Sequence, residues 1–129
     1  MIEYWRLFLI FGFLGWLIDT AYRSYIDKKY APGTWLPCFG ISYAIAGILV
    51  TTVFRYVPAS AIVQIIIATL LSTLLELLGG ILALAVLKRR LWDYRAHPYN
   101  FLGHIEVRHA LYWVFIISCM RLVYHFVQF

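Results

Sequence analysis

Long apolar stretches separated by short polar segments organise this sequence. Apolar residues dominate from Tyr4 to Ile26, and no charged residue occurs from Tyr30 to Phe54. From Tyr56 to Leu87 the only charged residue is Glu76, and a further apolar stretch follows His109. Runs of about 20 apolar residues have the length of a membrane-spanning helix. The pattern therefore predicts about four transmembrane helices, at residues 4–26, 36–54, 60–87 and 110–127.

Two of the connecting segments are distinctive. Pro32-Gly33 is a turn signal after the first span, whereas the segment from Lys88 to His109 is long and rich in polar side chains. Irregular backbone at membrane depth is tolerated where it lines a polar cavity. We therefore expect this third loop to be partly re-entrant. The third span is longer than one crossing needs, which predicts a tilt or a kink at Gly79-Gly80.

Composition supports the membrane assignment. Hydrophobic residues make up 64% of the 129 residues and charged residues only 13%, whereas soluble domains have about 25% charged residues. This composition excludes an ordinary cytosolic enzyme, a disordered chain and a nucleic-acid module. The expected fold is an all-α integral membrane protein that forms one compact domain over residues 1–129.

The distribution of basic residues predicts the topology. The first and third connections carry eight of the eleven, and the opposite side carries Arg6, Arg55 and Arg121. The positive-inside rule then places both large loops in the cytoplasm and both termini outside. The lipid bilayer is the expected partner, with no nucleic acid, and the expected location is the cytoplasmic (bacterial inner) membrane. The eight residues are Arg23, Lys28, Lys29, Lys88, Arg89, Arg90, Arg95 and Arg108.

Charged side chains inside the predicted spans require an explanation, because each costs roughly 2.5–3.5 kcal/mol on insertion scales. Asp19 and Arg23 are four residues apart and can form an intrahelical pair. Glu76 shares a helix face with small and hydroxyl residues, so it is expected to point into the bundle. Its expected state is protonated, or paired with Arg23, Arg108 or a tyrosine hydroxyl. Three spans carry small-residue faces of the kind that let helix backbones approach closely.

Other motifs contribute little. Cys38 and Cys119 form no metal-binding or disulfide pattern, and no metal or cofactor is expected. The chain has no G-x-x-x-x-G-K-[ST] motif, so ATP-driven transport would require a separate ATPase. Arg121 and His125 are expected to form an interfacial pair that reaches outward.

Short motifs in order along nearly the whole chain resemble the putative ABC-transporter type IV membrane family. The most specific are Trp92-Asp93-Tyr94 and Asn100-x-x-Gly103. Asp19 stands where the family usually has Glu, His104 stands where it usually has Arg, and Glu106 is an unusual acid at its position. The other matches are Phe13-Leu14-Gly15-Trp16 with Tyr22 and Arg23, Leu36-Pro37 with Phe39-Gly40, Leu75-Glu76 with Gly80, and Pro98, Ile105, Arg108 and Trp113.

The resemblance implies a small permease-like protein that binds or translocates a small or charged substrate in a polar intramembrane pocket. Two alternatives stay open: a membrane-embedded enzyme acting on a lipid or lipid-linked substrate, and an accessory subunit of a membrane complex. A separate ATPase or a second copy of the chain would be the protein partner. The residues expected to line the pocket are Asp19, Tyr22, Arg23, Glu76, Trp92, Asp93, Tyr94, Asn100, His104 and Arg108.

Overall fold

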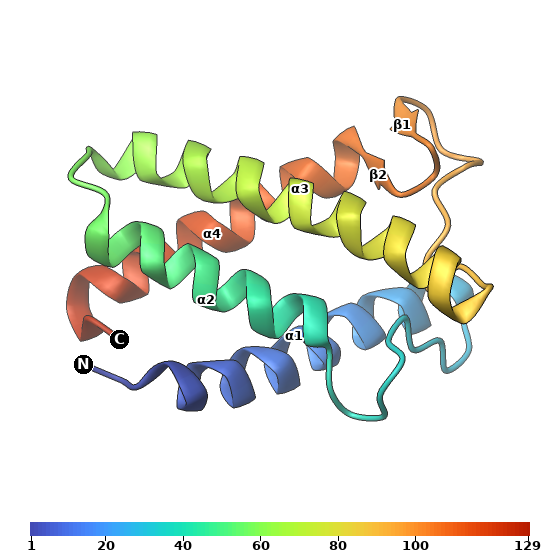
Figure 1. Cartoon of the computed structure of the whole chain (residues 1–129), viewed down its shortest axis with the longest axis horizontal. Helices are drawn as coiled ribbons and strands as arrows, with labels where there is room; N and C mark the ends of the chain where they lie inside the picture. The colour runs from blue at the N-terminus through green and yellow to red at the C-terminus, as the bar shows by residue number, and fades with distance from the viewer. The chain divides into compact units, whose positions relative to one another are not determined.

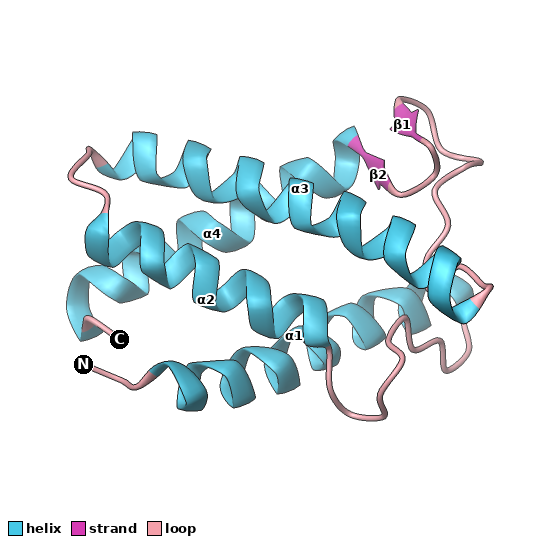
Figure 2. Cartoon of the chain, viewed as in Figure 1, coloured by secondary structure: helices cyan, strands magenta, loops and turns pink.

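A computed structural model describes all of residues 1–129 and confirms the helical fold (Figures 1 and 2). The four helices are α1 (Tyr4–Asp27), α2 (Ile41–Tyr56), α3 (Ala61–Leu87) and α4 (Val107–Val127). A two-stranded antiparallel hairpin, β1 (Asn100–Phe101) with β2 (Ile105–Glu106), lies between α3 and α4. The chain forms two compact units, Ile2–Ile48 and Leu49–Phe129, and α2 passes from one into the other.

Three of the helices, α1, α3 and α4, are long and apolar enough to cross a membrane. Helix α2 has 16 residues, which corresponds to ~24 Å at 1.5 Å per residue. This is shorter than the roughly 30 Å hydrocarbon core of a bilayer. Helix α3 has 27 residues and a length of ~40 Å, and it continues as one α-helix through Gly79 and Gly80.

The second helix begins five residues later than the sequence pattern predicts. Leu36 and Phe39 instead form an isolated β-bridge around a tight turn, in which Cys38 adopts φ 58°. The backbone N–H of Gly40 donates to the carbonyl of Gly12 in α1 at 2.9 Å. Apolar composition alone does not separate these turn residues from a helix, because the turn is fixed by contacts with α1.

Glycine contacts hold the first unit together. A Cβ atom on Gly12 would collide with the Phe39 ring, and one on Gly15 would collide with Tyr43. A Cβ on Gly47 of α2 would collide with Phe11 of α1. The predicted small-residue faces therefore allow close approach of aromatic side chains as well as of backbones.

The second unit has its apolar core between the end of α2, α3 and α4. Val53, Phe54, Ala68 and Ile117 are among its buried members. Arg121 lies beside this core and donates to Gln64 Oε1 at 2.7 Å, with its guanidinium over the Phe54 ring. The expected outward pairing of Arg121 with His125 is therefore wrong, because a buried amide on α3 offers Arg121 an acceptor within the protein.

Candidate functional site

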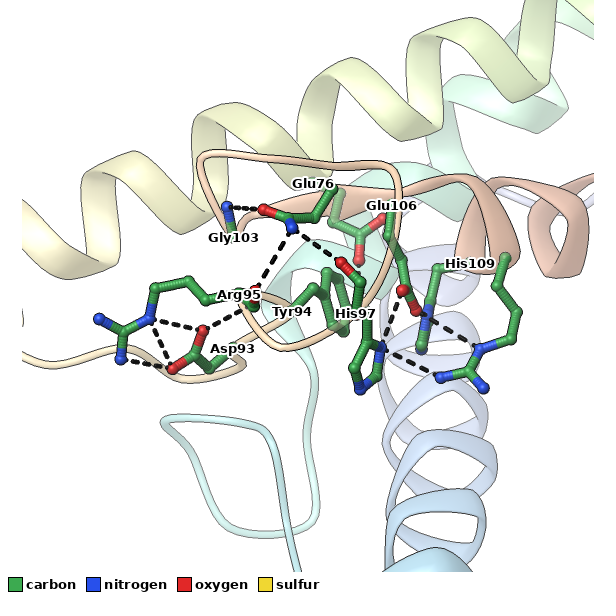
Figure 3. A network of polar contacts seen from close by, with 10 residues as sticks. Glu76, Asp93, Tyr94, Arg95, His97, Gly103, Glu106 and His109 are labelled. Atoms are coloured by element: carbon green, nitrogen blue, oxygen red, sulfur yellow. Dashed lines mark hydrogen bonds and ion pairs between the residues drawn. The ribbon is translucent and has the colours of Figure 1, made fainter.

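The intramembrane acid Glu76 is hydrogen-bonded to groups from two other segments. The hydroxyl of Tyr94, in the third loop, donates to Glu76 Oε1 at 2.9 Å (Figure 3). The indole Nε1 of Trp113, on α4, donates to Oε2 at 3.1 Å. Both donors are neutral and hold the two carboxylate oxygens in fixed directions. The tyrosine hydroxyl that the sequence offered as a partner is thus present, and Trp113 is an additional one.

The face of α3 that carries Glu76 also carries buried hydroxyl groups. Thr69 is 8% exposed and Ser72 is 1% exposed. Their hydroxyl oxygens, and that of Thr73, are buried without a hydrogen-bond partner. Residues 69, 72, 73 and 76 follow helical spacing, so they share one face of the helix. Buried hydroxyls without a hydrogen-bond partner are uncommon in folded proteins.

Tyr94 links Glu76 to a second polar cluster. Its side chain is buried, and its ring stacks on His109 with centroids 4.3 Å apart and on His97 with centroids 5.8 Å apart. Its backbone N–H donates to the carbonyl of Gly103 at 2.9 Å. The position of the Tyr94 hydroxyl on Glu76 therefore depends on how the third loop folds and on the imidazole rings beside it.

Glu106 is the centre of this second cluster, which we name the Glu106 cluster: Glu106, His97, His109 and Arg108. The Glu106 side chain is only 1% exposed, and its Oε2 lies 2.8 Å from His97 Nδ1. Its Oε1 contacts His109 Nδ1 and lies 3.6 Å from Arg108 Nε (Figure 3). A buried carboxylate is therefore compensated by three basic side chains, as burial of a charge requires.

The Glu106 carboxylate determines which ring nitrogen of each imidazole carries a proton. An ionised carboxylate only accepts hydrogen bonds, so both imidazoles must carry a proton on Nδ1. Arg108 Nη2 lies 3.1 Å from His97 Nδ1, and it cannot donate to a nitrogen that already carries a proton. Arg108 thus acts on Glu106 through its charge.

Electrostatics of the third loop favour the charged acids and the neutral form of His104. Burial raises the pKa of Glu106, but hydrogen bonds from His109 and His97 outweigh it, so that its pKa lies below the ordinary value. Hydrogen bonds from Arg95 lower the pKa of Asp93 to about 2. Burial, together with the charge of Arg90, lowers the pKa of His104.

The third loop folds back along α3, and its partial re-entry into the membrane stays a prediction. His104 packs on Gly80, where a Cβ atom would lie 2.5 Å from its Nδ1. The indole of Trp92 donates to the carbonyl of His104 at 2.9 Å and lies beside Gly79. These contacts place the hairpin beside the C-terminal turns of α3.

Asn100 and Gly103 build the turn of the hairpin. Asn100 Oδ1 accepts the backbone N–H of Gly103 at 3.0 Å, and its Nδ2 donates to the carbonyl of His97 at 2.8 Å. Gly103 has φ 72°, and a Cβ atom there would lie 2.9 Å from Arg90 Nη1. The Asn-x-x-Gly motif is thus explained by loop structure.

Asp19 and Arg23 form the predicted pair within the first unit. Arg23 Nε donates to Asp19 Oδ2 at 2.8 Å, and Asp19 is 8% exposed. A Cβ on Gly33 would lie 2.5 Å from Arg23 Nε, so the connection after α1 packs closely on the pair. Tyr22, the remaining predicted residue of this unit, lies half-buried on α1.

The structure groups the predicted residues unevenly. It joins Glu76 to Tyr94, and it places Trp92, Asp93, Asn100 and His104 together in the third loop. Arg108 pairs with Glu106. The pocket that Asp19, Arg23, Glu76 and Arg108 were expected to share stays a prediction.

The predicted pocket residues did not include the partner Trp113, the hydroxyls of α3, or three members of the Glu106 cluster: Glu106, His97 and His109. The expected start of the last span, near residue 110, hid their relation. Helix α4 begins at Val107, which brings His109 within one turn of Glu106. If the helix had been predicted to begin before Arg108 and His109 rather than after them, the pairing of His109 with Glu106 could have been predicted.

Four helices, three of them long enough to span a bilayer, and charged groups buried among them define a helical membrane protein. The model of the family described as "Putative ABC-transporter type IV" matches residues 6–128, and the chain belongs to this family. No curated protein and no solved structure matches the chain.

Proposed function

We propose that this protein is a permease-like membrane protein in which the polar face of α3 binds a small or charged solute on its way across the bilayer. The observation that supports the proposal is the set of buried hydroxyls without partners, at Thr69, Ser72 and Thr73, beside Glu76. In hydrocarbon an unsatisfied polar group is costly. A polar solute or water passing along this face would satisfy these groups.

Glu76 would make the proposed solute path along α3 selective for positively charged groups. Polar and ionisable residues inside membranes are expensive and are usually retained for function. Hydrogen bonds from Tyr94 and Trp113 orient the carboxylate without adding a positive charge of their own. A carboxylate inside a membrane favours a cation, a proton or a basic group on a solute as its ligand. ATP-driven transport would require a separate ATPase subunit, because the chain lacks a P-loop motif.

Two substitutions on α3 test the proposal. Glu76→Gln keeps the shape and most hydrogen-bonding capacity of the side chain but removes the charge. Ser72→Ala removes a hydroxyl that has no partner, so folding should lose little or even gain stability. If the hydroxyl and the charge serve a solute, both variants should reach normal protein levels and fail to restore growth of a strain lacking the gene.

The matched control is Glu3→Gln, the same chemical change at an exposed acid near the N-terminus. It should complement fully. Full complementation by Glu76→Gln and Ser72→Ala at normal protein level would contradict a solute path along α3. If Glu76→Gln lowers the protein level, Ser72→Ala tests the proposal instead, because Ser72→Ala removes no native hydrogen bond.

A membrane-embedded enzyme acting on a lipid-linked substrate is the second candidate. The Glu106 cluster supports it, since a buried carboxylate that orients two imidazoles is an arrangement used in general acid–base catalysis. The two candidates differ in which acid is essential. An enzyme built on the cluster loses activity in His97→Gln and His109→Gln, whereas a permease built on α3 retains activity in His97→Gln, the more exposed of the two positions.

A further inference from the structure

The β1–β2 hairpin exposes large apolar side chains just before β1, within β1 and in the turn after it, and we name these residues, Tyr99, Phe101 and Leu102, the hairpin tip. Their exposed fractions are 84%, 55% and 59%. Exposed apolar residues on membrane-spanning helices face lipid and need no other explanation. The hairpin tip lies on a loop, where a cluster of exposed apolar side chains marks an interaction surface.

The backbone holds these side chains outward at a conformational cost. Tyr99 and Leu102 both have φ 55°, a region that bulky residues rarely adopt. Asn100, between them, fixes the turn through its hydrogen bonds to Gly103 and His97. Strained backbone of this kind persists where the surrounding structure enforces it, and it is frequent at binding sites.

The hairpin packs near an end of α3 that is long enough to reach the headgroup region of a bilayer. His104 packs on Gly80, seven residues before the end of α3 at Leu87, which is ~10 Å along the helix. Because α3 is ~40 Å long and the hydrocarbon core is about 30 Å thick, the end of α3 extends into the headgroup region. Figure 1 shows the hairpin near the C-terminal half of α3.

A basic segment, Lys88 to Arg90, leads from α3 to the hairpin tip. Lys88 and Arg89 are exposed directly after α3. Arg90 Nη1 donates to the carbonyl of Leu102 at 3.0 Å, which places a guanidinium at the base of the tip. Aromatic residues favour the membrane interface, and basic residues near it attract acidic lipids.

We propose that the hairpin tip inserts among the headgroups of acidic phospholipids, with Lys88, Arg89 and Arg90 facing their phosphates. The apolar tip supplies the affinity for the interface, and the basic segment supplies the preference for anionic lipid. This binding element is independent of the solute path on α3, and it would anchor the third loop, and with it Tyr94, to the bilayer surface.

Spin labelling of the full-length protein in lipid vesicles tests the proposal. Cys38 and Cys119 are free and exposed, and both are replaced by serine. A nitroxide is then attached at Phe101→Cys, and its collision rates with oxygen and with a water-soluble nickel chelate are measured. The vesicles contain phosphatidylcholine alone or phosphatidylcholine with phosphatidylglycerol.

The expected result is a several-fold higher ratio of oxygen to nickel accessibility at position 101 than at the control Ala96→Cys, an exposed loop position outside the tip. The ratio at position 101 should fall when phosphatidylglycerol is omitted. It should also fall in Lys88→Gln/Arg89→Gln but not in the charge-retaining Arg89→Lys. Equal ratios at positions 101 and 96 would overturn the proposal and indicate a tip that meets water or a protein. A ratio independent of lipid charge would overturn the preference for acidic lipid.

Discussion

Glu76 and Glu106 are two acids of the same unit with different kinds of partner. Glu76 accepts hydrogen bonds from the neutral groups of Tyr94 and Trp113. Glu106 contacts two imidazoles and lies near the Arg108 guanidinium. The imidazoles compensate the buried carboxylate of Glu106 and stabilise the loop. Under the proposed function, the solute binds at Glu76, and Glu106 supports the fold of the loop.

The Glu106 cluster predicts acid-sensitive stability. The pKa of Glu106 is lowered from its ordinary value of 4.5, so its ionised form stabilises the folded state above that value. This contribution is lost as the pH falls from about 4.5 through the lowered pKa of the folded state. Glu106→Gln should cost about 2 kcal/mol near pH 7, the scale of hydrogen bonds to a charged group.

Thermal unfolding in detergent at a series of pH values provides the measurement. The difference between wild type and Glu106→Gln should shrink as the pH falls below about 4.5, because the wild-type carboxylate then becomes neutral as well. Glu3→Gln, at an exposed position, should show no such convergence. A difference that stays constant between pH 7 and pH 3 would contradict a charged Glu106 in the folded protein.

At the scale of elements, the third loop depends on two adjacent glycines of α3. Gly79 and Gly80 lie under different parts of the loop. A Cβ atom at Gly79 would meet the Trp92 ring at 3.7 Å, an ordinary contact, whereas one at Gly80 would lie 2.5 Å from His104 Nδ1 and 3.1 Å from its Cβ. The hairpin can therefore approach α3 closely only at Gly80.

These neighbours form a matched pair of substitutions. Gly79→Ala should be neutral or stabilising by up to about 1 kcal/mol, because alanine favours the helix. Gly80→Ala should destabilise by about 1–3 kcal/mol, the usual cost of overpacking, and should loosen the loop. Thermal stability and proteolysis near Arg95 measure the two effects. Equal stability of both variants would show that the hairpin does not rest on Gly80.

At the scale of the whole molecule, the helices and the family establish a membrane protein, and the basic residues predict its orientation. Both connections that carry most of the positive charge, 28–40 and 88–106, should lie on the cytoplasmic side. Both termini would then lie outside. In this orientation the hairpin tip would meet the inner leaflet, where acidic lipids are concentrated.

Cysteine labelling in intact cells tests this topology. Lys29→Cys and Ala96→Cys, each in a background without Cys38 and Cys119, should resist a membrane-impermeant maleimide until the cells are opened. Met1, extended by a cysteine-containing tag, should react from outside. Labelling of either loop in intact cells would reverse the orientation or place the two loops on opposite sides.

The sequence by itself determined the class of protein and the approximate helices. Apolar runs of spanning length and a low content of charge leave few folds other than a helical bundle in lipid, because the bilayer requires every backbone group to be bonded within the chain. The pairing of Asp19 with Arg23 followed from helical spacing alone. The small-residue faces likewise predicted where Gly12, Gly15 and Gly47 allow close contact.

Tertiary structure decided the partners of the polar side chains. The start of α2 depends on the hydrogen bond from the Gly40 N–H to the Gly12 carbonyl. The orientation of the Arg121 side chain depends on its hydrogen bond to Gln64 of α3. In the Glu106 cluster, the fold of the third loop brings His97 Nδ1 to 2.8 Å from the carboxylate. Periodicity describes one element at a time, whereas these contacts join residues from different elements. Their geometry follows from packing in three dimensions and not from spacing along the chain.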